Sequence, residues 1–211
     1  MTSCNVLTPI QVRVLGVLIE KERTVPDTYP LTLNSLLAGS NQKSSRDPVM
    51  ELTESDLIHA LDELKSEGWI ADHLSGRVAR YSQLFGKVLQ IPSQSVAVLA
   101  ILMLRGPQTA GELRNNCERL HRFSDISAIE AFLHELAERS AGALVTLLPR
   151  QPGEREPRWA HLLSGEVDLA ALPTRSAAPD PSGLQARIEQ LEADLAALQA
   201  EFAALKSQLG D

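Results

Sequence analysis

The sequence has few of the residues that mark secreted or membrane-embedded proteins. Its two cysteines, Cys4 and Cys117, are too few for a disulfide framework and fit a reducing compartment. No run of eighteen apolar residues is present, and the N-terminus lacks the basic-then-apolar order of a signal peptide. We therefore expect a soluble, cytoplasmic protein that does not enter a membrane.

Residues in catalytic or metal-binding patterns are also scarce. The five histidines and two cysteines stand at no metal-ligand spacing. A phosphate-binding glycine loop, a nucleophile elbow and an H-E-x-x-H motif are all missing. Cys117 lies four residues before His121, but a buried structural cysteine explains it more simply. The sequence predicts a protein that is not an enzyme and that needs no metal or cofactor.

Acidic and basic residues are unevenly distributed along the chain. The net charge of the chain is −7, which argues against indiscriminate binding to nucleic acid. Residues 1–86 have 8 basic and 11 acidic side chains (−3), residues 87–165 have 9 and 8 (+1), and residues 166–211 have 3 and 8 (−5). The middle of the chain is therefore the part best suited to meet a polyanion.

Residues 1–86 show three helical patterns followed by two strand patterns. Each helix is expected to begin at a threonine that can cap it, and the second and third end near a glycine. A turn at Ser75-Gly76-Arg77 separates the two strands. The predicted elements are a helix from the cap Thr8 to about Glu22, a short helix from Thr32 to Gly39, a helix from Thr53 to Gly68, and strands Trp69–Leu74 and Val78–Leu84.

Residues 87–165 repeat this order. An apolar helix over Ser93–Arg105 is followed by capped helices that begin at Thr109 and Ser127. The strands Leu144–Leu148 and Arg158–Leu163 then flank a loop. Two copies of one order of elements, each with its caps in place, are a strong indication of a repeated fold.

Three helices and then a β-hairpin is the order of a winged helix. Aromatic residues make up only 4% of the chain, so leucine, alanine and valine must fill the interior, which favours helices. We predict a mainly α protein with small β-hairpins, built as two tandem winged-helix domains and a C-terminal coiled-coil helix. The expected boundaries are 1–86 and 87–165 for the domains, 166–182 for a Pro/Ala-rich linker and 183–211 for the helix.

The C-terminal segment carries a heptad pattern of under four repeats. It predicts a homodimer or a higher homo-oligomer, although a helix that folds back onto its own domains fits the same pattern. A coil this short is marginal alone and needs support from domain contacts. The positions assigned to oligomerisation are Leu184, Ile188, Leu191, Leu195, Leu198, Phe202, Leu205 and Leu209.

A polar loop, Asn41–Val49, separates the second and third helices of the first copy. Two interpretations stay open for it. Lys43 and Arg46 could supply charge to an anion or partner site, while the neighbouring amides and hydroxyls supply directional hydrogen bonds. Alternatively, Arg46 pairs with Asp47, Glu20, Glu22 or Glu51, and Asn41 ties down the helix ends.

Winged helices usually bind DNA through the third helix, but here its outward positions are acidic in both copies. Any contact with DNA phosphates should therefore come from loops and wings. The alternative is that these cations are ordinary solvated side chains. The candidate nucleic-acid or anion-binding residues are Lys43, Arg46, Arg77, Arg80, Arg114, Arg119, Arg122, Arg150, Arg155 and Arg158.

Several stretches resemble a known family. LTPIQVRVLGVLIEKERTVPDTYPLTLNSLL followed by NQKSSRDPVMEL, together with LRGPQTAGELRNN and LVTLLPRQPGEREPRWAHLLSG, is similar to the YceH-like family of uncharacterised bacterial proteins. The resemblance covers about residues 7–165. It implies a tandem winged-helix architecture in a bacterial cytoplasm and assigns no activity to any residue.

Three hypotheses follow. The first is a non-enzymatic, self-associating DNA-binding or transcription-linked regulator. The second is a protein–protein interaction module, comparable to the acidic tandem winged-helix subunits of chromosome-condensation complexes. The third is a sensor that binds a small ligand at the polar loop.

Overall fold

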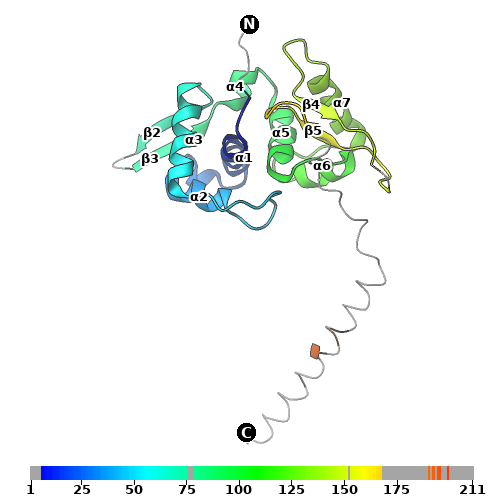
Figure 1. Cartoon of the computed structure of the whole chain (residues 1–211), viewed down its shortest axis with the longest axis horizontal. Helices are drawn as coiled ribbons and strands as arrows, with labels where there is room; N and C mark the ends of the chain where they lie inside the picture. The colour runs from blue at the N-terminus through cyan, green and yellow to red at the C-terminus, as the bar shows by residue number, and fades with distance from the viewer. Residues whose placement is uncertain are drawn as a thin grey trace, which may run out of the picture. The chain divides into compact units, whose positions relative to one another are not determined.

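The computed structural model describes residues 6–75, 78–151 and 153–167, together with positions 190, 192, 194, 195 and 199. The chain divides into two compact units, Met1–Val167 and Asp168–Asp211, and the first contains the named helices and strands (Figure 1). Of the eight heptad positions, only Leu195 is described, and it is helical and exposed. The other seven lie outside the described residues.

The first half of the Met1–Val167 unit contains three helices followed by a hairpin, as predicted. A short strand that was not predicted precedes the second helix and pairs with the hairpin, so that β3 lies between β1 and β2 in an antiparallel sheet. The elements are α1 (Pro9–Thr24), the 3-10 turn η1 (Pro26–Thr28), β1 (Leu31–Thr32), α2 (Leu33–Ser40), α3 (Glu54–Ser66), β2 (Ile70–Ser75) and β3 (Val78–Gln83).

The second half has the same order after a short connecting helix that the sequence pattern did not reveal. Its two strands are shorter than predicted and pair antiparallel, with Thr146 opposite Ala160. The elements are α4 (Phe85–Leu89), α5 (Ser93–Arg105), α6 (Ala110–Cys117), α7 (Ile126–Ala137), β4 (Val145–Leu147) and β5 (Trp159–His161).

Helix caps explain most of these boundaries. The side chains of Thr8, Thr32, Thr53 and Thr109 each accept a hydrogen bond from a backbone N–H in the first turn, as predicted. The prediction that Ser127 caps the third helix of the second half is wrong. Asp125 caps it two residues earlier, accepting from the N–H of Ala128, because a carboxylate is a charged acceptor that also favours the positive end of the helix.

The two halves share a further detail. Leu31, directly before the cap of α2, pairs with Tyr81 in β3. Gln108, directly before the cap of α6, exchanges backbone hydrogen bonds of 3.0 and 2.8 Å with Trp159 in β5. In both halves, therefore, the residue that leads into the second helix is tied to the returning strand of the hairpin.

The first helices of the two halves pack against each other and share one hydrophobic core. All residues from Gln11 to Ile19 in α1 and from Ser95 to Leu104 in α5 are buried. Gly16 allows the close approach, because a Cβ there would lie 2.9 Å from Leu104 Cδ2. A helix buried on every side needs neighbours all around it, and each first helix supplies one of those neighbours to the other.

Two backbone hydrogen bonds also join the halves. The N–H of Asp47 in the polar loop donates to the carbonyl of Leu104 at 2.8 Å, and the N–H of Leu7 donates to the carbonyl of Leu163 at 2.8 Å. Within the described part of the chain, no helix combines the length and the apolar character that spanning a membrane requires.

Candidate nucleic-acid interface

The predicted basic residues fall into two groups, those that hold the fold together and those that face solvent. Arg46, in the polar loop, belongs to the first group. Its side chain is buried, and it donates two hydrogen bonds to the carboxylate of Glu20, at 3.1 and 2.6 Å, and one to the carbonyl of Gly39 at 3.2 Å. Its guanidinium is therefore not presented to a ligand.

Arg46 also changes the pKa of the Glu20 carboxylate. Burial by itself raises the pKa of Glu20, but the hydrogen bonds and positive charge of Arg46 outweigh it, so that the pKa is lowered. Asn41 fixes the other end of the loop by exchanging two 2.8 Å hydrogen bonds with the backbone of Leu52. These are the contacts expected of a structural loop, and of its two cations only Lys43 is exposed.

A second buried arginine in this region was missed by the sequence patterns. Arg13 lies in α1, is only 1% exposed, and donates to the backbone carbonyls of Ser40 and Pro48. Burial, together with the nearby charge of Arg46, lowers its pKa. The available signal was its place within an apolar helical face, between Val12 and Val14, where an exposed arginine is not expected.

Arg80 and Arg158 also serve the fold. Arg80 donates to the carbonyl of Pro30 at 2.8 Å, which ties β3 to the segment before α2. Arg158 bridges Glu112 and Glu154, each at 2.7 Å. Burial lowers the pKa of Arg158, but its hydrogen bonds to the two glutamates raise the pKa by more than burial lowers it, so the net shift is upward. Arg77 lies outside the described residues.

Three predicted cations of the second half lie in α6 or in the segment after it, namely Arg114, Arg119 and Arg122. Arg119 and Arg122 are exposed, and the side chains of both form no ion pair and no hydrogen bond with another described residue. Arg114 is half-buried and donates to the carbonyl of Ser124 at 3.2 Å, while its Nε is buried without a partner. Three cations therefore lie within nine residues of chain, at the surface of the second half.

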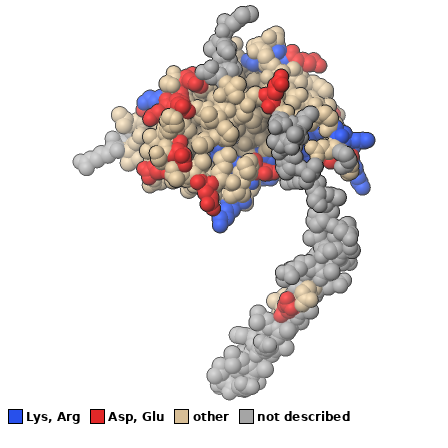
Figure 2. Space-filling model, viewed as in Figure 1, with Lys and Arg blue, Asp and Glu red and all other residues tan. Residues whose placement is uncertain are grey.

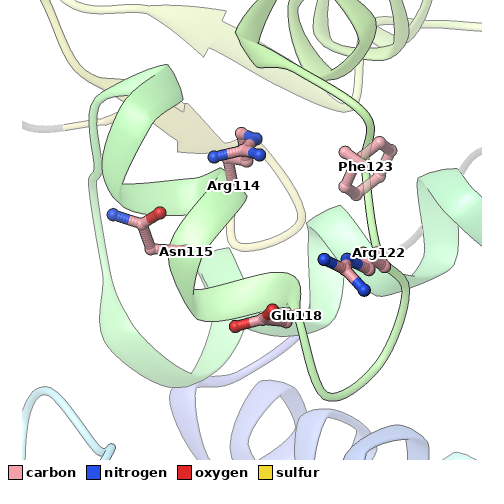
Figure 3. Close-up of a pocket in the computed structure, with 5 residues that line it drawn as sticks. All are labelled: Arg114, Asn115, Glu118, Arg122 and Phe123. Atoms are coloured by element: carbon pink, nitrogen blue, oxygen red, sulfur yellow. The ribbon is translucent and has the colours of Figure 1, made fainter.

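Arg114 and Arg122 border a shallow polar hollow of about 70 Å³ (Figure 3). Arg114 projects from α6, and the guanidinium of Arg122 is turned back toward that helix. Asn115 and Glu118 complete the polar lining, and the ring of Phe123 closes one side. A hollow of this size has room for one small group such as a phosphate, although the carboxylate of Glu118 reduces its positive potential.

Two more arginines, Arg150 and Arg155, lie in the loop between β4 and β5. Both are exposed, and neither forms an ion pair with another described residue. Figure 2 shows Lys and Arg side chains gathered at the edge of the first unit that carries this loop, and Asp and Glu side chains over the part that carries α3. In this view the edge with the loop is therefore more basic than the part that carries α3.

Comparison with known proteins identifies relatives of the whole chain. A family model described as a protein of unknown function, DUF480, matches residues 7–154. A UPF0502 protein of Acidovorax sp. (strain JS42) is 57% identical over 212 residues, which cover 97% of this chain and 94% of the relative. The chain belongs to the UPF0502 family.

Other members of the UPF0502 family are similar over nearly their full length. The protein of Dechloromonas aromatica (strain RCB) is 55% identical over 90% of this chain and 91% of its own length. That of Leptothrix cholodnii (strain ATCC 51168 / LMG 8142 / SP-6) is 52% identical over 97% of this chain and 96% of its own length. The match to the family model includes Arg114 in α6 and Arg119 and Arg122 after it, and it ends at Glu154, within the loop between β4 and β5.

The third helices of this UPF0502 chain present the acidic surfaces that the sequence predicts. In α3 the side chains of Glu54, Asp56 and Asp62 are exposed, and in α7 those of Glu130 and Glu135 are exposed. These carboxylates would repel the phosphates of a duplex laid along either helix. The exposed arginines of the second half lie outside these helices, at Arg119 and Arg122 after α6 and at Arg150 and Arg155 in the loop between β4 and β5.

Cys117 has no role in such an interface. It is fully buried in α6, and its Sγ lies 3.8 Å from the carbonyl oxygen of Ala97. Burial raises the pKa of the thiol to about 12, so that it stays protonated at neutral pH. It therefore packs as a small apolar side chain.

Proposed function

We propose that the chain is a non-enzymatic, tandem winged-helix protein that binds DNA as an oligomer, in a DNA-binding or transcription-linked regulatory role. One observation carries the proposal. Of the five described arginines that are exposed and form no ion pair with another described residue, four lie in the second half, at Arg119, Arg122, Arg150 and Arg155, and the fifth is Arg23. Free cations on one face are the electrostatic requirement for contact with phosphates.

The winged-helix assignment is supported by the repeated order of three helices and a hairpin. It is also supported by the pairing of the residue before the second helix with the returning strand, which recurs in both halves. In this proposal the loop between β4 and β5 is the wing of the second domain, and its arginines contact the backbone of the duplex.

The mode of binding differs from the usual one for this fold. The acidic side chains of α3 and α7 keep both third helices away from the phosphates, so the second helix and the wing make the contacts. Contacts to phosphate alone give affinity without base selection. We therefore expect the described part of the second half to bind duplexes of any sequence with similar, salt-sensitive affinity.

Oligomerisation would strengthen such weak contacts. The heptad pattern over 183–211 favours two or more copies held together, and two linked basic surfaces bind one duplex more tightly than either does alone. Deletion of residues 183–211 should leave a folded monomer with weaker binding. An unchanged oligomer after this deletion would refute the coiled-coil assignment.

Binding to a fluorescent duplex of arbitrary sequence, at about 50 mM salt, tests the proposal. The double variant Arg119→Ala/Arg122→Ala should bind at least about tenfold more weakly than the unmodified chain, because each lost phosphate contact removes a released counterion. The variant Arg23→Ala/Lys43→Ala changes the net charge equally in the first half and is the control. If no duplex binds at this salt concentration, the proposal is wrong.

A second candidate, binding to a protein partner, is favoured by the first half. The solvent face of α3 combines the exposed acids with Ile58, which is 42% exposed, and the edge strand β2 carries Leu74, which is 84% exposed. An edge strand offers unpaired backbone groups to an extended segment, and the acids favour a basic one. Affinity capture of partners with and without nuclease separates this candidate from the first, because only nucleic-acid-mediated partners are lost on digestion.

A further inference from the structure

A cavity of about 400 Å³ lies where α5 begins and α7 ends, on a different part of the second half from the arginines of α6. Its lining combines residues of both helices and of the turn between α4 and α5. This volume falls within the range of natural small-molecule sites, which are mostly apolar with a few convergent polar groups. The duplex-binding proposal leaves this cavity unused.

One end of the cavity is electropositive and offers hydrogen-bond donors. Pro92 is the N-cap of α5 and provides no side-chain acceptor, so the N–H groups of the first turn lack the cap that a threonine or aspartate provides elsewhere in this fold. Ser95, in the same turn, lines the cavity, is 1% exposed, and has an Oγ with no hydrogen-bond partner. A buried hydroxyl without a partner is costly, and a ligand with an acceptor oxygen would satisfy it.

The residues that α7 contributes to the cavity include two acids. Glu135 and Glu138, in the last turn of α7 and at its C-cap, line the cavity and are exposed, and the carbonyl end of the helix adds to their negative potential. Arg139 also lines the cavity, but its guanidinium is hydrogen bonded to the carbonyl of Leu89. A cationic group is therefore favoured beside the two glutamates.

Apolar side chains also line the cavity. Ile91 and Pro92 come from the turn before α5, and Leu136 comes from α7. Donor groups at the start of α5, carboxylates at the end of α7 and apolar side chains in one cavity match a molecule that carries a carboxylate, an ammonium group and an aliphatic side chain. We propose that this cavity binds a free aliphatic amino acid. The inference does not rest on nucleic-acid binding.

In the proposed complex, the carboxylate of the amino acid lies at the N-terminus of α5 and accepts a hydrogen bond from Ser95. Its ammonium group faces Glu135 and Glu138, and its side chain packs on Ile91 and Leu136. The anion is then placed at a helix N-terminus and the cation at a helix C-terminus, which are the favourable ends for each charge.

Isothermal titration calorimetry of the full chain with each of the twenty amino acids tests the proposal. L-Leucine, or another aliphatic member of the set, should bind saturably, with Kd between about 1 µM and 1 mM. Two analogues of leucine serve as probes: 4-methylpentanoate lacks the ammonium group and isopentylamine lacks the carboxylate. Each should bind at least about tenfold more weakly, because each loses one charged end. If none of the twenty binds at about 10 mM, the proposal is overturned.

Variants locate the binding. Ser95→Ala should weaken leucine about five- to tenfold, yet the unliganded variant should unfold at the same or a higher temperature, because the change removes an unsatisfied hydroxyl. Glu135→Gln/Glu138→Gln should weaken leucine but not 4-methylpentanoate. Glu130→Gln, on the same helix but not in the lining, should bind leucine normally. Binding that Ser95→Ala and the double variant leave unchanged would place the ligand elsewhere and overturn the proposal.

Discussion

Arg46 and Lys43 lie three residues apart in the polar loop, but their surroundings give them different roles. Arg46 is enclosed by α1 and α2 and pairs with Glu20, which is 26 residues away in sequence. Lys43 is exposed and forms no ion pair with another described residue. The sequence leaves open whether Arg46 serves a binding site or pairs with a nearby acid, and the packing of the loop against α1 shows the pairing with Glu20.

The first prediction concerns this pair. Arg46→Ala should lower the free energy of unfolding by about 3–5 kcal/mol, because it removes the buried partner of the Glu20 carboxylate and leaves it only Lys21, at 3.5 Å. Lys43→Ala, in the same loop, should change it by less than about 0.5 kcal/mol. Urea denaturation of both variants measures the difference. Equal effects of the two substitutions would contradict the structural role of Arg46.

The second prediction concerns pH. Burial lowers the pKa of His161 from 6.5 to about 4, and its Nδ1 has no hydrogen-bond partner. Between these values the unfolded chain binds a proton that the folded chain does not, so stability is present above pH 6.5 and is lost as the pH falls toward 4. The loss at pH 5 should be about 2 kcal/mol.

Urea denaturation at pH 7.5 and pH 5 measures that loss, and His161→Phe is the reference. The variant cannot take up the proton, so it should lose about 2 kcal/mol less than the unmodified chain over the same interval. Other groups that titrate in this range act equally in both proteins and cancel in the comparison. Identical losses would show that His161 titrates normally in the folded state.

At the scale of the elements, the contact between α1 and α5 fixes the arrangement of the two halves. Gly16 lies at this contact, with Leu104 Cδ2 at 2.9 Å and Leu104 Cγ at 3.0 Å from a Cβ added to it. Any side chain there must displace Leu104, which is 1% exposed and closely packed. The glycine therefore sets how closely the helices approach.

The third prediction follows from this contact. Gly16→Ala should lower the free energy of unfolding by about 1–3 kcal/mol, because the added methyl group overpacks the interface. Gly111→Ala is the matched control, because that helical glycine has its nearest neighbouring atom at 3.9 Å. It should be neutral or stabilising by up to about 1 kcal/mol through helix propensity. Thermal unfolding of both variants measures the two changes in stability.

The elements were also the part of the fold that local sequence signals could predict best. The sequence showed the four threonine caps and the order of helices and hairpins, because capping and periodicity depend on residues that are close together in the chain. The strand β1 and the bridge from Gln108 to Trp159 were not, since each joins segments about fifty residues apart. The cap Asp125 was missed because Ser127 begins an equally good local pattern.

At the scale of the whole molecule, the two halves resemble each other in their elements but differ in how they use charge. The first half uses its buried arginines Arg13 and Arg46 to hold the polar loop against α1. The second half keeps Arg119 and Arg122 on the surface. The candidate site could therefore be predicted only as a list of cations, since the separation of structural from exposed arginines depends on partners distant in sequence.

The salt dependence of duplex binding tests the central claim, that the second half contacts phosphates, most directly. A plot of log Kd against log salt concentration should have a slope of about 3 to 4 for the unmodified chain. For Arg119→Ala/Arg122→Ala the slope should fall by about 2, which is one for each lost contact. Arg23→Ala/Lys43→Ala should keep the slope of the unmodified chain. Equal slopes for all three proteins would contradict the claim, as would an absence of binding at low salt.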